Sequence, residues 1–196
     1  KNNINLLIDF DSTFVTLESL DVISQLSLQN NKNKISKIMQ ITNKAMVGEI
    51  PFSEALNQRI EIINASKKHI NKATDILKKN ISVSFINHIN FLKENSKNIF
   101  IISGGFKEII FPIVKKFNIK YEHIFANEFL FDKQNNIYGI NKNNPLSNDK
   151  GKVEVAKQIC GKNIIIGDGY TDYEVKKYNA ADFFIQFVET VNRKNI

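Results

Sequence analysis

Three short apolar runs, each followed by acidic or small residues, constrain the fold of this chain most strongly. They cover residues 5–8, 98–102 and 163–166, and they read NLLI, NIFII and NIII. Runs this short and this rich in isoleucine and leucine are typical of buried strands. Apolar residues at helical spacing follow in 106–117 and 151–159. Strands that alternate with helices predict an α/β fold with a Rossmann-like, doubly wound and mostly parallel sheet.

Between the first two runs the apolar residues recur every three to four positions, as in Leu17, Leu20 and Ile23, without strand-like alternation. Pro51 interrupts this pattern, and Ser53 is expected to be the N-cap of the next helix. We therefore expect residues 15–80 to form a helical subdomain, inserted after the first strand of a core made of 1–14 and 81–196.

Three further local features are predicted in the second half of the chain. Residues 123–131 and 137–140 are expected to be strands joined through a turn at 135–136, and residues 183–187 are expected to be a last strand. Thr171 and Glu174 have the spacing of a capping box at the start of a helix.

Composition excludes several classes of protein. The chain has 196 residues, of which 42% are hydrophobic and 24% charged, as in ordinary globular proteins. No apolar run approaches the ~20 residues that span a bilayer, so we expect no membrane association. Cys160 is the single cysteine, which excludes an internal disulfide and favours a reducing, cytoplasmic location. The three histidines are isolated and there is no thiol cluster, so a zinc site is not expected.

The formal charge of +7 is compatible with nucleic acid, an anionic membrane or a small anionic substrate. The lysines occur as scattered doublets, such as 67–68 and 115–116, and such doublets are typical of solvated helix faces. No basic and aromatic residues cluster together. We therefore expect a small-molecule substrate and no nucleic-acid partner, and the sequence gives no indication of the oligomeric state.

The residues that end the three apolar runs carry the chemistry. They read DFD at 9–11, SGG at 103–105 and DGYTD at 168–172. Ligands of open α/β sheets bind outside the carboxyl ends of the strands. If these strands are parallel neighbours, four carboxylates, a hydroxyl and bare glycine amides converge there. Lys150, one element earlier, can reach the same place.

Asp9 and Asp11 point the same way from extended backbone, and two charges ~4 Å apart repel by about 4 kcal/mol at an effective dielectric constant of ~20. Asp168 and Asp172 add negative charge. A divalent cation, a shared proton or a nearby lysine makes such a cluster tolerable, and oxygen ligands favour Mg²⁺ over zinc. The glycines at 103–105 suit phosphate oxygens.

These parts are the equipment for phosphoryl transfer through an aspartyl-phosphate. Taken singly, each has a structural interpretation: Asp-x-Asp as turn chemistry, Ser-Gly-Gly as a loop, Lys150 as a surface charge. Their occurrence in order, each at a strand end or helix start, favours catalysis. Neither a complete dinucleotide fingerprint nor a Walker motif is present.

The same segments resemble the four motifs of the haloacid dehalogenase superfamily of phosphatases. The matches are DFDST at 9–13, SGGF at 103–106, Lys150, and GDG with Asp172 at 167–172. Within that superfamily the chain is most similar to the phosphoserine phosphatase family. The segment AMVGEIPFSEALNQR at 45–59 follows the signature of that family's cap, and Glu18 falls at the family's position.

This resemblance implies an Mg²⁺-dependent phosphomonoesterase that hydrolyses O-phospho-L-serine to L-serine and phosphate, a step of serine biosynthesis. It implies Asp9 as the nucleophile and Asp11 as the general acid/base. Asp9, Asp168 and the backbone carbonyl of Asp11 would hold the metal, with Asp172 supporting them.

The resemblance also implies the groups that hold the substrate. Ser103, Gly104 and Lys150 would bind the phosphoryl group. Glu18 would meet the substrate ammonium and Arg59 its carboxylate. The remaining substrate-binding residues would be Met46, Phe52 and Thr171.

Three departures from the family concern the substrate more than the reaction. Many members have Asn where Thr171 stands and a small residue where Tyr170 stands, and the tail at 182–196 does not follow the family closely. An alternative is therefore a related phosphatase or phosphotransferase that acts on another small phosphorylated acid or alcohol. A nucleic-acid-binding protein with a vestigial catalytic fold and a non-catalytic interaction protein are disfavoured, because all the catalytic positions are filled.

Overall fold

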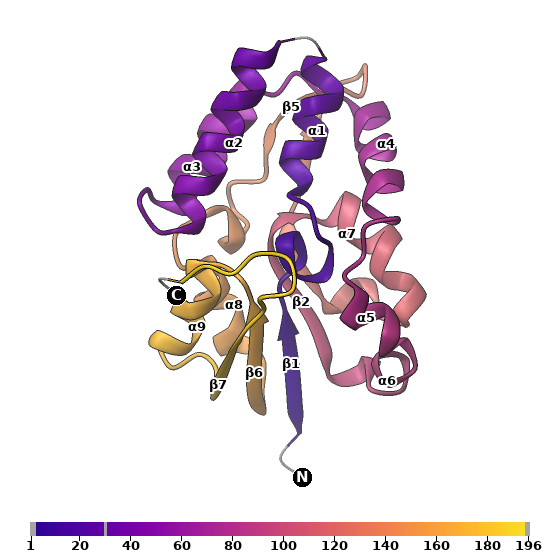
Figure 1. Ribbon diagram of the computed structural model, residues 1–196, viewed down its shortest axis with the longest axis vertical. Coiled ribbons are helices and arrows are strands. Elements are labelled where there is room, and N and C mark those ends of the chain that lie inside the picture. The colour runs from indigo at the N-terminus through magenta and orange to yellow at the C-terminus, as the bar shows by residue number, and fades with distance from the viewer. Residues whose placement is uncertain (1–2, 30, 195–196) are drawn as a thin grey trace.

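The computed structural model describes residues 3–29 and 31–194. Its centre is a five-stranded sheet with the order β3-β2-β1-β6-β7, in which every pair is parallel. The strands are β1 (Ile4–Ile8), β2 (Ile99–Phe106), β3 (Ile124–Asn127), β6 (Lys162–Gly167) and β7 (Phe183–Gln186). The predicted parallel α/β sheet is confirmed, and the three apolar runs are its three central strands (Figure 1).

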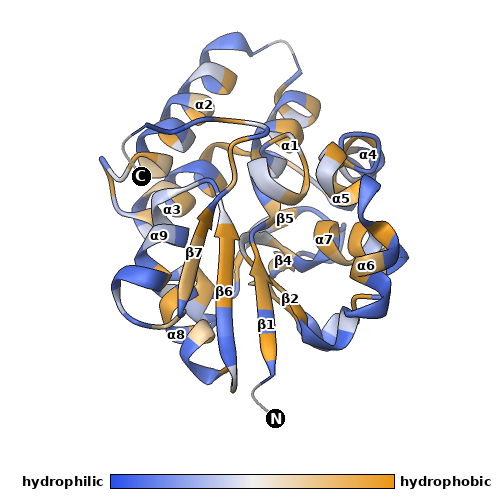
Figure 2. Ribbon diagram, turned by 60° about the horizontal axis from the view of Figure 1, so that its bottom comes forward, coloured by the Kyte–Doolittle hydropathy of each residue, from blue (hydrophilic) through white to orange (hydrophobic). Residues whose placement is uncertain are grey.

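Helices cover both faces of the sheet. The helices that follow residue 81 are α5 (Val83–Asn87), α6 (Ile89–Glu94), α7 (Lys107–Val114), α8 (Gly151–Gln158) and α9 (Tyr170–Lys177). Successive side chains of a strand point to opposite faces. Ile8 packs in one hydrophobic cluster with Ile109 of α7, whereas Leu7 packs in another with Val153 of α8 and Val175 of α9. The strands are accordingly apolar nearly throughout (Figure 2), and the sheet is doubly wound.

Residues 15–80, which we call the insert, form the helices α1 (Ser19–Leu28), α2 (Lys32–Met46), α3 (Phe52–Ile62) and α4 (Lys67–Leu77). Helix α1 packs against α2 and α4, and α2 packs against α3. The four helices lie beyond the carboxyl ends of the strands, at the top of Figure 1. Helix α4 also contacts α7, so the insert rests on the core along one side.

The two ends of the insert lie side by side. The Thr16 N–H donates to the Asn80 carbonyl over 2.8 Å, and Val15 forms an antiparallel bridge with Ile81. The chain therefore leaves the core and returns to it at one place, close to the end of β1.

The segment 123–131, expected as one strand, divides between two sheets. Its first part is β3, and its second part is β4 (Phe129–Phe131), which pairs antiparallel with β5 (Ile137–Ile140). The turn expected at 135–136 is present, with Asn135 in the left-handed region at φ 64°. This hairpin touches the insert, because the Lys67 N–H donates to the Asn135 carbonyl over 3.0 Å.

Two predicted helix caps are wrong. Helix α3 begins at Phe52 with Pro51 as its N-cap, and the Ser53 N–H donates instead to Oδ1 of Asp149, 2.9 Å away in the core. Helix α9 begins one residue before Thr171, and Oδ2 of Asp172 accepts the Gly169 N–H over 3.1 Å. In both cases a carboxylate accepts a backbone N–H at the start of the helix, where such groups lack a partner within the helix.

Candidate active site

Asp9 follows directly on the last residue of β1. Its N–H donates to the Ile166 carbonyl of β6 over 2.9 Å, and its Oδ1 accepts the Phe10 N–H over 2.7 Å. The chain then turns sharply, with Ser12 in the left-handed region at φ 55°. Asp9 and Asp11 both have extended backbone, on either side of Phe10, directly beyond the end of β1.

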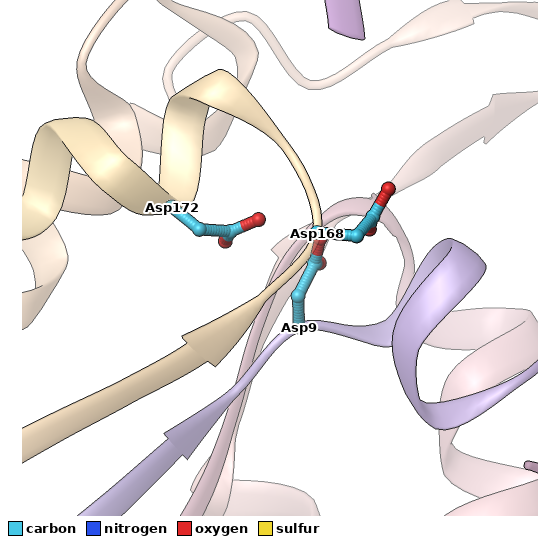
Figure 3. Close-up of side chains that lie close together, drawn as sticks. All are labelled: Asp9, Asp168 and Asp172. Atoms are coloured by element: carbon cyan, nitrogen blue, oxygen red, sulfur yellow. The ribbon is translucent and has the colours of Figure 1, made fainter. Parts of the chain in front are cut away.

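Asp9, Asp168 and Asp172 form an acidic cluster at the sheet edge. Each offers a carboxylate oxygen within 4.8 Å of the others, and all three residues are buried. They come from the end of β1, the end of β6 and the first turn of α9 (Figure 3). Three carboxylates at this spacing are a donor set suited to a hard divalent cation.

Burial, and next the charge of Asp9, raise the pKa of Asp168 above its ordinary value. The same two causes raise the pKa of Asp172. Carboxyls with raised pKa values are stabilised by any added positive charge. A bound cation would therefore stabilise the charged form of these carboxylates.

Lys152 is the lysine that reaches this cluster. Its Nζ lies 2.9 Å from Oδ1 of Asp9 and 2.7 Å from Oδ1 of Asp172, and the side chain is buried. Burial opposes its charge, but the carboxylates of Asp172 and Asp9 outweigh burial and raise the pKa of Lys152. The ammonium is a fixed positive charge beside Asp9.

The structure places Lys150 elsewhere. Lys150 is the N-cap of α8, with a left-handed backbone at φ 59°, and its Nζ lies 4.4 Å from the centre of the Tyr178 ring. Sequence reasoning missed Lys152. The Lys-Gly-Lys pattern at 150–152 offered two candidates, and the start of α8 at Gly151 determines which of them turns toward Asp9.

The first residue of α1 holds the carboxyl group of Asp11. Its Oδ1 accepts the Ser19 N–H over 3.0 Å and its Oδ2 accepts the Ser19 hydroxyl over 2.9 Å. Burial, and next the charge of Asp9, raise the pKa of Asp11 to about 7, although the Ser19 hydrogen bonds act in the opposite direction. A carboxyl with this pKa can both give and take a proton near neutral pH.

Ser103, Gly104 and Gly105 lie near the carboxyl end of β2. The Ser103 Oγ accepts the Gly105 N–H over 3.0 Å, and Ser103 is almost fully buried. The side-chain amide of Asn127 donates to the carbonyls of Gly104 (2.9 Å) and Leu146 (3.0 Å). Asn127, which sequence reasoning did not single out, thereby links the end of β2 to the segment that leads into α8.

Glu18 and Arg59 bring opposite charges from the insert. Oε1 of Glu18 accepts the Ser12 hydroxyl over 2.6 Å. Arg59 is 3% exposed, and its guanidinium donates to the Ala55 carbonyl and the Thr42 hydroxyl over 3.2 and 3.3 Å. Burial lowers the pKa of Arg59 and raises that of Glu18. Within 3–29 and 31–194, Arg59 has no carboxylate within 4.0 Å.

One pocket collects most of the residues singled out in the sequence. Its lining consists of Asp9, Asp11, Glu18, Leu20, Met46, Phe52, Arg59, Ser103, Gly104, Gly105, Lys152 and Thr171. Lys150 lines a neighbouring pocket that shares Phe52, Gly104, Lys152 and Thr171. The structure thus brings the expected catalytic, phosphate-binding and substrate-binding side chains together in one pocket, except for Lys150, and adds Lys152 to them.

The insert lies directly on the site. The Phe52 ring is so close to Gly104 that a β-carbon there would overlap it, and Met46 Sδ is 3.3 Å from where a β-carbon of Gly169 would stand. The Tyr170 ring packs against Gly48 of the insert. The backbone of Gly48 is in the left-handed region, at φ +77°. The pocket is therefore covered.

The C-terminal segment adds a residue that the sequence did not indicate. Nε of Arg193 lies 2.9 Å from Oδ2 of Asp168, and the Thr13 hydroxyl donates to Oδ1 of the same carboxylate over 3.1 Å. Asp168 is thus oriented from both sides.

No protein-family model matches the chain. Among curated proteins, the phosphoserine phosphatase of Drosophila melanogaster is 31% identical over 198 residues, which are 96% of this chain and 69% of that protein. The chain belongs to the phosphoserine phosphatase family.

Two further comparisons agree with this assignment. The chloroplastic phosphoserine phosphatase of Arabidopsis thaliana is 31% identical over 182 residues. These residues are 90% of this chain, and they span 60% of the length of that relative. The crystal structure of a phosphoserine phosphohydrolase-like protein from Francisella tularensis superposes with a TM-score of 0.90 at 31% identity, covering 98% of this chain and 91% of that one. The predicted family and the haloacid dehalogenase type of fold are confirmed.

Membership places this phosphatase-family chain among phosphoric monoester hydrolases, enzymes whose substrates are small phosphorylated molecules. The donor set of the acidic cluster fits the divalent metal that such phosphatases use. Among the described residues, no helix is long and apolar enough to cross a membrane.

Proposed function

We propose that this chain is an Mg²⁺-dependent phosphomonoesterase that hydrolyses O-phospho-L-serine to L-serine and phosphate. The observation that carries this proposal is Arg59. A buried guanidinium is costly unless it is paired, and within the described ranges no carboxylate lies within 4.0 Å of it. It lines one pocket with Asp9 and Glu18. A substrate with a carboxylate and an ammonium satisfies both charges.

We assign the nucleophile to Oδ2 of Asp9. Oδ1 is engaged by Lys152 and by the Phe10 N–H, whereas Oδ2 has no hydrogen bond within the part of the chain described. Oδ2 attacks phosphorus, and the bond from phosphorus to the serine oxygen breaks. Asp11 gives its proton to that oxygen, because an alkoxide is a poor leaving group. Asp11 then takes a proton from the water that attacks the aspartyl-phosphate, and the bond from phosphorus to Oδ2 breaks.

The phosphoryl oxygens have three kinds of partner in this proposal. The Lys152 ammonium offsets their charge and takes the role that the sequence suggested for Lys150. The Ser103 hydroxyl and the backbone N–H groups at Gly104, near the end of β2, supply hydrogen bonds. These groups are arranged before the substrate arrives, so little reorganisation accompanies the reaction.

The metal would be held by Asp9, Asp168 and the backbone carbonyl of Asp11, with Asp172 supporting the site. Oxygen-only donors favour a hard divalent ion, and Mg²⁺ fits them better than zinc. When bound, the ion supplies positive charge that lowers the repulsion between the anionic nucleophile and the phosphate.

The two ends of phosphoserine are assigned to the insert. The Arg59 guanidinium meets the carboxylate and Glu18 meets the ammonium. Met46 and Phe52 exclude water from above, and Thr171 lines the side of the pocket. We also propose 15–80 as the cap and 1–14 with 81–196 as the catalytic core, since the two ends of the insert are hydrogen-bonded together.

A cytoplasmic location is proposed from the single cysteine, which favours a reducing compartment. A relative described as chloroplastic shows that the family also occurs in another compartment.

The test is release of inorganic phosphate from phosphoserine with Mg²⁺, repeated with EDTA and with Asp9→Asn. We expect release only from the unmodified chain with metal. Full activity of Asp9→Asn would remove the nucleophile assignment. Preferred turnover of another small phosphorylated acid or alcohol in a substrate panel would change the assigned substrate and leave the reaction type standing.

A further inference from the structure

Ser19 contacts both carboxylate oxygens of Asp11. Its N–H donates to Oδ1 over 3.0 Å and its hydroxyl donates to Oδ2 over 2.9 Å. Ser19 is 1% exposed, so no water competes freely for these bonds. It is also the first residue of α1, the first helix of the insert.

The local structure explains why these bonds form. The first N–H groups of a helix have no partner inside the helix. Glu18, the N-cap of α1, makes no capping hydrogen bond with its side chain, which accepts the Ser12 hydroxyl instead. The carboxylate of Asp11 takes over the capping, from a position eight residues earlier in the chain.

A carboxyl group with a single partner can still turn about its Cβ–Cγ bond. Two donors on one residue, one for each oxygen, fix the plane of the group. Gly105 lies against the same group, since a β-carbon there would stand 3.1 Å from Oδ2 of Asp11. The orientation of Asp11 in the pocket is therefore set by the start of the insert and by the last residues of β2.

We propose that Ser19 is a positioning residue for the reaction, whose hydroxyl holds the Asp11 carboxyl in the plane from which it delivers its proton to the leaving oxygen. The proposal rests on the proposed function, in which Asp11 is the general acid. It adds that packing of α1 against the core and orientation of the Asp11 carboxyl occur together, because Ser19 takes part in both.

The leaving group separates this role from a structural one. A serine alkoxide needs a proton as it departs, whereas p-nitrophenolate departs without one. The ratio kcat/KM covers the steps up to departure of the leaving group. Loss of orientation at Asp11 should therefore reduce kcat/KM for phosphoserine and spare kcat/KM for p-nitrophenyl phosphate.

The variants are Ser19→Ala, Ser19→Thr and the matched control Ser24→Ala. Ser24 lies in the same helix and is also buried, but its hydroxyl donates to the Asp21 backbone carbonyl over 2.7 Å. We expect Ser19→Ala to lower kcat/KM for phosphoserine about 10-fold and that for p-nitrophenyl phosphate by no more than about 2-fold, as part of the contribution of a general acid is lost. Ser19→Thr keeps the hydroxyl and should recover most of the loss. Ser24→Ala should change both substrates equally and little.

A double-mutant cycle with Asp11→Asn completes the test. If Ser19 acts through Asp11, adding Ser19→Ala to Asp11→Asn causes no further loss on phosphoserine. Equal losses on both substrates, no loss on either, or a full additional loss in the Asp11→Asn background would each overturn the proposal. A chain that hydrolyses another alkyl phosphate but not phosphoserine would overturn the proposed substrate alone, and the Ser19 comparison is then made on that ester. Absence of any phosphatase activity would overturn both.

Discussion

The Nζ of Lys152 lies 2.9 Å from Oδ1 of Asp9, and this buried ion pair leaves Oδ2 as the oxygen of Asp9 without a hydrogen bond in the described structure. The same ammonium contacts Asp172 at 2.7 Å. One cation thus links the proposed nucleophile to the helix that follows β6. It also distinguishes two lysines that stand only two positions apart in the sequence.

Lys152→Met should abolish most of the activity, whereas Lys150→Met should retain most of it. The first change removes the charge beside Asp9 and leaves two buried carboxylates without their partner, and the second removes a cation that lies over the Tyr178 ring. We expect a loss of about 100-fold or more in kcat for Lys152→Met. Steady-state kinetics on phosphoserine measure both. The opposite ranking would return the phosphate-binding role to Lys150.

Arg59→Ala should impair phosphoserine selectively. The substrate carboxylate loses a buried guanidinium, so KM for phosphoserine should rise about 100-fold, as for a charged hydrogen-bonded pair. An aryl phosphate without a carboxylate should change little. Gln58→Ala, on the same helix but bonded to Glu54 at the surface, is the control. Equal losses on both substrates would show that Arg59 does not select a carboxylate.

Addition of Mg²⁺ should raise the midpoint of thermal unfolding, and Asp168→Asn should remove most of this shift. The carboxyl of Asp168 has its pKa raised by burial and by Asp9, so it gains from an added cation. Asp182→Asn, a carboxylate that accepts the Asn163 N–H away from the cluster, is the comparison. The measurement needs no substrate. An undiminished shift in Asp168→Asn would place the ion elsewhere.

The metal-free protein should become less stable as pH rises from about 4 to 7, with Asp11 as one cause. Its pKa is 3.8 ordinarily and about 7 in the folded chain, so the folded state binds more protons in this window and the free energy of unfolding falls with rising pH.

Asp11→Asn has no proton to lose, so the stability that it gains over the unmodified chain should grow between pH 5 and pH 8. Thermal unfolding in EDTA measures this difference, and ~2 °C corresponds to roughly 1 kcal/mol or less at this length. A stability difference for Asp11→Asn that stays constant over this pH range would mean that the pKa of Asp11 is not raised.

The strand ends were predictable because strand periodicity and parallel topology are local and general rules. They place Asp9, Ser103 and Asp168 at one edge of the sheet before any coordinates are known. Glu18 and Arg59 came from the resemblance of the insert, since no periodicity indicates that two helices bring opposite charges to one pocket.

The remaining contacts depend on positions that sequence patterns fix poorly. Lys152 faces Asp9 because α8 starts at Gly151, and a difference of two residues in that start exchanges the lysines. Ser19 contacts Asp11 from the first turn of α1, eight residues later in the chain, and no periodicity indicates such a contact. Arg193 reaches Asp168 through a tail without regular structure, whose path no residue pattern encodes.

The hydrogen bond between Thr16 and Asn80 joins the two ends of the insert. Because both ends are held at one place, a helical turn gained or lost in α2 would change the shape of the insert without separating β1 from β2. Selectivity for the rest of the substrate can therefore drift in evolution, or be re-engineered, while the machinery that cleaves the phosphate ester stays as it is.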